Sequence, residues 1–193
     1  ANDTLLGLGG RDKLFGGDGD DLLDGGTGAI DQLSGGAGDD TYLINREAGM
    51  AFIGGSAERA EGGFDRIVLT DVEFDEVELG FINYPAAGNP AWFDHGLTLD
   101  ISWQEAGVTN RLRVSQEGRR FESFEFSDGV SLNAIKLGEI DGSTINGTDG
   151  SDWILGASAA DTMTGGNGAD IFQMSDVAGT HVITDFEDGS DLL

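Results

Sequence analysis

The chain has 193 residues, and its 36 acidic and 10 basic side chains give a formal net charge of −26 at pH 7. So negative a charge argues against nucleic acid and anionic membrane surfaces as partners and favours multivalent cations. The 33 glycines with only 2 prolines exclude a collagen-like or proline-rich linker, and the absence of cysteine excludes disulfides and thiolate metal sites. No apolar run reaches the length of a transmembrane segment.

The segment Gly16–Asp24 reads GGDGDDLLD, which we interpret as six turn residues followed by three strand residues. Glycines at its first, second and fourth positions permit positive φ and close backbone approach. The sixth position is Asp21, and Leu23 at the eighth is expected to point inward. Two such units form one coil of eighteen residues, so each unit lies on the second one after it, with strands about 4.8 Å apart.

Units of this kind fill the first block, residues 1–44. Stacking pairs Asp3 with Asp21 and Asp21 with Asp40. It also pairs Asp12 with Asp31, although an extra residue near Ile30 and the replacement of a glycine by Leu8 make that pair the weakest. The inward positions are Leu5, Leu14, Leu23, Leu33 and Tyr42.

The middle segment, residues 45–137, follows a different pattern. Residues 45–62 are small and polar and are expected to form a loop, and Gly62 to Asp65 resembles a single turn before a strand at 66–70. Apolar and polar residues alternate at 97–103 and 121–126, which indicates strands. We therefore expect a mostly antiparallel β unit that packs on the end of the first coil and covers its last layer.

The second block, residues 138–193, is less regular. Only Gly165–Gln173, with Asp170, is a complete unit, and Asp152 lies two units before it. Asp161 is kept in a unit where alanines replace two glycines. The tail at residues 181–193 is expected to form a strand and an acidic turn that cover this coil.

Stacked aspartates one layer apart repel each other unless a cation lies between them. Six to eight oxygen ligands in a flexible cage suit calcium better than magnesium, and inward-turned carbonyls would complete such a cage. A disordered acidic tail is the competing interpretation, and tandem units in phase argue against it. The predicted calcium-site residues are Asp3, Asp12, Gly17, Asp18, Gly19, Asp21, Gly26, Gly28, Asp31, Gly36, Gly38, Asp40, Asp149, Asp152, Asp161, Gly166, Gly168 and Asp170.

Catalysis and ligand binding are alternative functions for the chain. Catalysis finds little support, because His95 and His181 have no partnered nucleophile and no hydrolase or metalloprotease motif is present. Binding of a glycan or peptide is the second alternative, with Trp92 in a proline-flanked loop and Trp103 in a strand as candidate contacts. Core packing is the simpler explanation for these aromatic residues.

The units GGDGDDLLD, GGAGDDTYL and GGNGADIFQ resemble the RTX family of hemolysin-type calcium-binding repeats. The resemblance implies an all-β fold, with parallel β-roll blocks at 1–44 and 138–193 flanking the capping segment. It also implies several bound Ca²⁺ ions, export by type I secretion machinery of Gram-negative bacteria, and an extracellular or cell-surface location. RTX modules accompany proteases, lipases, epimerases, toxins and adhesins, and we expect this sequence to be a segment of such a longer protein.

Overall fold

The computed structural model describes eight stretches of the chain and divides into two compact units. The first unit comprises residues 1–121 and 125–130, and the second comprises 122–124 and 131–193. Within the described stretches the regular elements are strands, apart from one 3₁₀ turn at Phe74–Glu76, and none is a helix long and apolar enough to cross a membrane. The described residues are 1–28, 30–54, 63–84, 96–115, 121–137, 144–156, 160–174 and 180–193.

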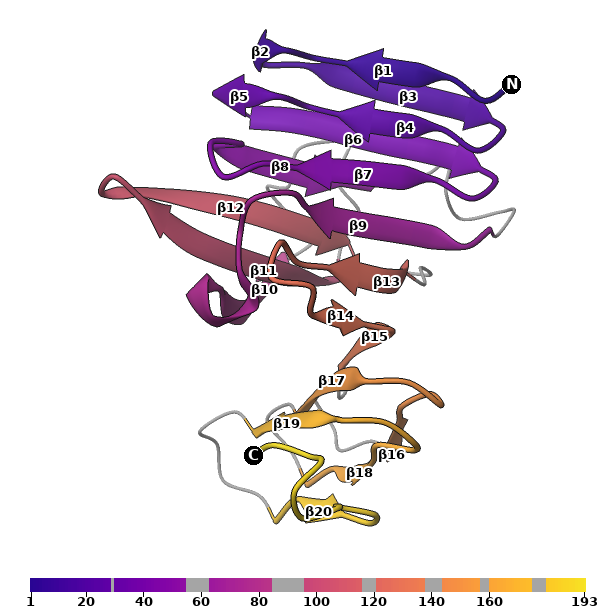
Figure 1. Ribbon diagram of the computed structural model, residues 1–193, viewed down its shortest axis with the longest axis vertical. Coiled ribbons are helices and arrows are strands. Elements are labelled where there is room, and N and C mark those ends of the chain that lie inside the picture. The colour runs from indigo at the N-terminus through magenta and orange to yellow at the C-terminus, as the bar shows by residue number, and fades with distance from the viewer. Residues whose placement is uncertain are drawn as a thin grey trace. The chain divides into compact units, whose positions relative to one another are not determined.

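In the first unit, strands of the repeats stack in parallel as two facing rows (Figure 1). One row contains β1, β4, β7 and β9 in that order, and the other contains β3, β6, β8, β12, β11 and β10. Leu5 lies beside Leu23, and Leu23 lies beside Tyr42, so the predicted stacking of each unit on the second one after it is confirmed. The strands are β1 (Thr4–Leu6), β2 (Gly9–Gly10), β3 (Lys13–Asp18), β4 (Leu22–Asp24), β5 (Thr27–Gly28), β6 (Ile30–Ala37), β7 (Thr41–Ile44), β8 (Met50–Ile53), β9 (Asp65–Leu69), β10 (Glu78–Tyr84), β11 (Gly96–Glu105) and β12 (Val108–Ser115), and β13 (Phe121–Glu125) spans the boundary between the units.

The core of the coil lies between these two rows. Leu23, Leu33 and Tyr42 are fully buried, whereas Leu5 and Leu14 are only partly buried because they belong to the first layer. Tyr42 is the largest of the five predicted inward residues, and its hydroxyl accepts a hydrogen bond from the Gly35 N–H at 2.8 Å. The alternation of inward apolar and outward polar residues thus specifies which face of each short strand is buried.

The coil continues beyond the repeats, which corrects the expectation of a loop throughout residues 45–62. Residues 50–53 form β8, which pairs in parallel with β6 on one side and with β12 on the other. On the opposite row β9 pairs in parallel with β7. The antiparallel strands β10, β11 and β12 then extend the row that contains β8, so the middle segment covers the last repeat layer by continuing its hydrogen bonding.

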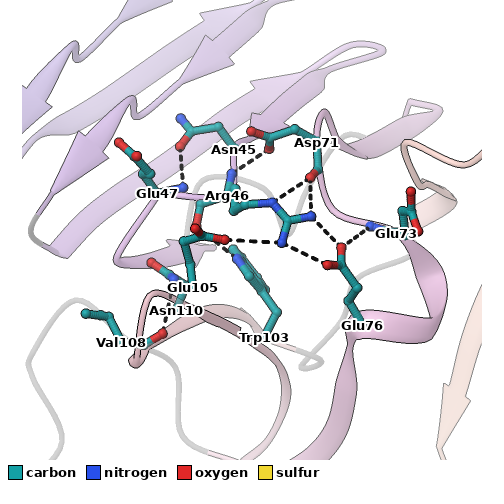
Figure 2. A network of polar contacts seen from close by, with 10 residues as sticks. All are labelled: Asn45, Arg46, Glu47, Asp71, Glu73, Glu76, Trp103, Glu105, Val108 and Asn110. Carbon is teal, nitrogen blue, oxygen red and sulfur yellow. Dashed lines mark hydrogen bonds and ion pairs between the residues drawn. The ribbon is translucent and has the colours of Figure 1, made fainter.

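Arg46, in the turn between β7 and β8, connects the coil to the following part of the middle segment (Figure 2). Its guanidinium donates hydrogen bonds to the carbonyl of Asp71 at 2.7 and 2.9 Å and forms ion pairs with Glu76 and Glu105. Its own carbonyl accepts the indole N–H of Trp103 at 2.9 Å. The hydrogen bond from Arg46 is the main cause that lowers the pKa of Glu76 below its usual range. Arg46 therefore connects the end of the last repeat to the 3₁₀ turn at Phe74–Glu76 and to β11.

The second unit is a smaller coil with two rows of parallel strands. One row contains β15, β17 and β19, and the other contains β16, β18 and β20. In the tail β20 pairs with β18, and Leu192 forms a parallel bridge to Ile171, so the predicted covering of this coil is observed. Its core consists of Ile145, Ile154, Met163 and Phe172, with Ile183 packed against them. The strands are β14 (Ser131–Leu132), β15 (Ala134–Leu137), β16 (Thr144–Asn146), β17 (Asp152–Gly156), β18 (Thr162–Thr164), β19 (Ile171–Met174) and β20 (Val182–Ile183).

Candidate metal centre

The glycines at the second and fourth positions of the repeats share a left-handed backbone conformation. All eight glycines predicted at these positions have positive φ, between 83° and 123°, which side chains disfavour. Leu8 occupies the second position of its unit and has a φ of 70°, so it adopts there a left-handed conformation that side chains disfavour. The eight glycines are Gly17, Gly19, Gly26, Gly28, Gly36, Gly38, Gly166 and Gly168.

The first glycine of each described unit does not have a positive φ, so its backbone conformation does not explain why glycine is required there. The space around it does. A Cβ atom on Gly16 would lie 2.1 Å from Oδ2 of Asp21 and 2.6 Å from the carbonyl oxygen of Gly35. On Gly7 it would lie 2.5 Å from the carbonyl oxygen of Gly25. The first glycine therefore leaves room for a carboxylate oxygen and a carbonyl oxygen to converge, a role that conformational freedom alone does not explain.

The sixth-position aspartates are connected layer to layer by hydrogen bonds. Oδ1 of Asp21 accepts the backbone N–H of Asp3 at 2.7 Å, and Oδ1 of Asp40 accepts that of Asp21 at 2.9 Å. Asp65 continues the series, since its Oδ1 accepts the N–H of Asp40 at 3.0 Å. Sequence periodicity did not identify Asp65 as a member, because it follows Asp40 by 25 residues where the repeat spacing requires eighteen or nineteen.

The opposite edge of the first coil has the shorter series that the sequence predicted. Oδ1 of Asp31 accepts the N–H of Asp12 at 2.9 Å, so the extra residue near Ile30 leaves this pair in register. In the following layer Ala51 lies beside Asp31 and supplies no carboxylate.

A second series of contacts, which the sequence analysis missed, runs along the fifth positions. Asp20 and Asp39 donate their backbone N–H groups to the side-chain oxygens of Asn2 and Asp20, both at 3.0 Å. Phe64 donates its N–H to Asp39 at 2.7 Å. The fifth-position side chains thus accept from the next layer, whereas the sixth-position carboxylates accept from the previous layer. In the sequence this second series is indicated by the recurrence of Asn or Asp immediately before the sixth position, at Asn2, Asp20 and Asp39.

Asp21 uses one carboxylate oxygen for the backbone N–H of Asp3, which leaves its second oxygen available for a cation. Oδ2 of Asp12 and Oδ2 of Asp21 are buried, and neither has a hydrogen-bond partner among the described residues. A buried polar atom without a partner costs about 1–3 kcal/mol, and more when it carries charge. These oxygens are therefore suited to a ligand that supplies positive charge.

These donors fit a hard cation that prefers oxygen. Carboxylate Oδ2 atoms and first-glycine carbonyls, such as Asp21 and Gly35, converge at the same place in the turn, and calcium takes six to eight such ligands. Among the described residues no cluster of three or more acidic or histidine side chains could hold a metal by itself. Backbone carbonyls would have to provide the remaining ligands.

The raised pKa values of two of these aspartates agree with the need for a cation. Burial is the main cause that raises the pKa of Asp31 above its usual range, and the neighbouring charges of Asp12 and Asp24 contribute. Burial likewise raises the pKa of Asp170, with contributions from the charges of Asp152 and Asp191 among others. In the absence of a cation the folded chain disfavours the charged forms of these carboxylates.

In the second coil Asp152 and Asp170 are one layer apart, as predicted. Oδ1 of Asp170 accepts the N–H of Asp152 at 2.9 Å, and Oδ1 of Asp191 in the tail accepts that of Asp170 at 3.0 Å. The second oxygen of Asp191 accepts the N–H of Glu187 at 2.8 Å. The tail therefore ends this series with a carboxylate whose two oxygens are both bonded to the backbone.

The other predicted site residues have different surroundings. Asp18 at the end of β3 and Asp149 outside the strands are both exposed, and Asp149 accepts a hydrogen bond from the side chain of Asn167. Asp161 is fully buried and lies next to His181. Trp103 is only 1% exposed, so it packs in the core and offers no face to a glycan or peptide. Trp92 lies outside the described residues, as does His95.

The space beside Gly16 gives a direct test of this geometry. We expect Gly16→Ala to destabilise the calcium-loaded protein by about 1–3 kcal/mol, the usual cost of overpacking, because the added methyl group would collide with Asp21 and Gly35. Gly9→Ala is the matched control, since its Cβ would meet only Thr27 at 3.5 Å, an ordinary contact. Urea unfolding in calcium measures both variants, and equal stabilities would contradict the proposed role of Gly16.

Comparison with known families gives a result for the repeat segments. The family model described as the RTX calcium-binding nonapeptide repeat matches residues 1–29, 30–43 and 138–172, in four copies. These segments contain the predicted units of both coils. No curated protein matches the chain.

Proposed function

Because this chain is built on RTX calcium-binding nonapeptide repeats, we propose that it is a structural module of a secreted protein that folds when it binds calcium. Repeats of this family bind Ca²⁺ and are typical of secreted proteins. The observation that carries the proposal is the pair of buried oxygens, Oδ2 of Asp12 and Oδ2 of Asp21, which have no hydrogen-bond partner among the described residues.

The proposed ligands are the stacked carboxylates and the turn carbonyls beside them. In the first coil these are the pairs Asp3–Asp21, Asp21–Asp40 and Asp12–Asp31, and in the second coil the pair Asp152–Asp170. A bound calcium supplies positive charge between oxygens that otherwise repel. We infer a structural role for the module, since an aspartate such as Asp21 binds the backbone of the neighbouring layer by Oδ1 and has Oδ2 left for the cation.

Calcium dependence suits a protein that crosses the cell envelope before it folds. Extracellular calcium modules commonly have dissociation constants of about 10⁻⁴–10⁻³ M, so such sites stay empty in a cytoplasm poor in calcium. We propose that the chain remains unfolded there, is exported by type I secretion machinery, and folds outside to support a neighbouring functional domain. The net charge of −26 opposes compaction until cations are bound.

A ligand-binding role of the middle segment has less support. It requires exposed aromatic side chains, and Trp103 is buried with its indole N–H bonded to Arg46. The function of the whole secreted protein, as an enzyme, toxin or adhesin, would reside in other domains.

Isothermal titration calorimetry with CaCl₂ and MgCl₂ tests the proposed function. We expect several calcium ions per chain with dissociation constants of about 10⁻⁴ M, together with a large enthalpy change from coupled folding. Magnesium is expected to bind much more weakly, because it demands octahedral geometry. Absence of calcium binding, or equal binding of both ions, would refute the proposal.

A further inference from the structure

One layer of the second coil has a histidine at the position that corresponds to Asp191 in the opposite row. Thr162 of β18 lies beside Val182 of β20, so Asp161 lies beside His181. The Val182 N–H donates to the carbonyl of Asp161 at 2.8 Å. The corresponding bond in the first coil runs from the N–H of Thr41, the residue after Asp40, to the carbonyl of Asp21 in the previous layer, also at 2.8 Å. His181 therefore occupies the sixth position of its layer, although no repeat pattern in the tail identifies it.

The imidazole contacts Asp161 in the way an aspartate would. Nδ1 of His181 lies 3.4 Å from the backbone nitrogen of Asp161 and 3.4 Å from its Oδ2. The side chain of His181 is 7% exposed and that of Asp161 is fully buried. A neutral Nδ1 can accept from the Asp161 N–H, and a protonated Nδ1 can donate to the carboxylate. Either form gives Asp161 a partner across the layer without a metal ion.

The space beside the first glycine also differs in this layer. A Cβ on Gly7, Gly16 or Gly147 would meet a carboxylate oxygen and the carbonyl oxygen of the first glycine one layer on. A Cβ on Gly156 would instead meet Nδ1 of His181 at 3.1 Å, its Cε1 at 3.2 Å and Oδ2 of Asp161 at 3.2 Å. The imidazole ring thus lies beside Gly156 in the place where a carbonyl oxygen lies beside Gly7, Gly16 and Gly147.

We propose that His181 excludes calcium from the Asp161 layer and closes that layer by direct contact with Asp161. This inference rests on the proposed function, because it presupposes that the stacked aspartate pairs of other layers bind calcium. Calcium is a hard cation that prefers oxygen, whereas an imidazole nitrogen suits transition metals. The layer has lost one of its two carboxylates and contains a ring in the space of a carbonyl ligand. Asp161, predicted from the sequence as a calcium ligand, is therefore a contact of His181.

This assignment gives the second coil a contact that does not require calcium. The layer that contains Asp161 pairs with β20, the strand of the tail. In the folded chain the tail is therefore held by the Asp161–His181 contact and by backbone hydrogen bonds, such as that from Thr184 to Met163 at 2.9 Å, none of which includes a calcium ion. His181 acts as a residue that determines which layers take the ion.

Counting bound calcium in the whole chain tests the inference. We expect His181→Asp to bind one calcium ion more per chain than the wild type in equilibrium dialysis, because it restores the second carboxylate and removes the ring. His181→Asn is the matched control, since it removes the ring without adding a carboxylate, and it should bind the same number as the wild type. Circular dichroism in calcium establishes that each variant is folded.

Two results would overturn the assignment. One is a folded His181→Asp variant that binds no additional calcium, and the other is a His181→Asn variant that loses one ion, which would make His181 a ligand. Both are distinct from failure of the proposed function, in which the wild type itself would bind no calcium. If His181→Asp does not fold, the ion count of His181→Asn alone still decides whether His181 contributes to a calcium site.

Discussion

Removal of calcium with EGTA is expected to abolish most of the strand signal of the chain in far-UV circular dichroism. At a dissociation constant of about 10⁻⁴ M and a tenfold excess of calcium, each site contributes about 1.4 kcal/mol. About four sites would then contribute about 6 kcal/mol, which is comparable to the total stability of about 5–15 kcal/mol of an ordinary domain. Without the ions, buried oxygens such as Oδ2 of Asp21 remain unsatisfied.

Addition of excess calcium to the same sample should restore the spectrum, and an equal concentration of magnesium should not. The contacts that need no metal, such as those of Arg46 in the first unit, are too few to replace the ions, because ion pairs at partly exposed sites contribute little. A spectrum that is unchanged in EGTA would mean that calcium decorates a fold that is already stable, and the proposed coupling of binding to folding would be wrong.

Asp21→Ala is expected to destabilise the calcium-loaded protein by about 3 kcal/mol, and more than Asp12→Ala. Asp21 is 2% exposed and lies between two layers, since its Oδ1 accepts from Asp3 and its N–H donates to Asp40. The loss combines a hydrogen bond to a charged group, about 1.5–3 kcal/mol, with at least one calcium site, about 1.4 kcal/mol. Asp12 is only partly buried, in the first layer of its edge.

Urea unfolding at saturating calcium measures this difference. Asp21→Asn is a useful companion, because it keeps the shape and one oxygen of the side chain while it removes the charge. We expect it to fall between Asp21→Ala and the wild type. Equal losses for Asp21→Ala and Asp12→Ala would show that the assignment of Asp21 to two layers is wrong.

Much of the first coil could be predicted from sequence because a nonapeptide repeat leaves little freedom of register. Two units form one coil, so the spacing that separates Asp3 from Asp21 also places Leu5 beside Leu23. The parallel β-roll and the positive φ of glycines such as Gly17 follow from the same pattern. The exact use of each carboxylate did not follow, because repulsion between charges does not reveal that Oδ1 accepts a backbone N–H of the previous layer.

The missed features are those that break the period. Asp65 and His181 occupy sixth positions, but both follow segments whose length differs from nine residues, so spacing could not identify them. β8 was expected to be a loop, because the sequence before Met50 is polar and its pairing with β6 is a long-range contact. The burial of Trp103 could not be predicted from composition, because the sequence alone does not distinguish an aromatic residue that binds a ligand from one that packs in the core.

The central claim is that calcium lies against the second carboxylate oxygen of the stacked aspartates in the first coil. Anomalous diffraction from crystals grown in calcium tests it directly. The account predicts an anomalous peak within about 2.3–2.6 Å of Oδ2 of Asp21, the usual Ca–O distance, with carbonyl oxygens of the turns completing the shell. Full occupancy of calcium elsewhere in the crystal with no peak beside Asp21 or Asp12 would contradict it.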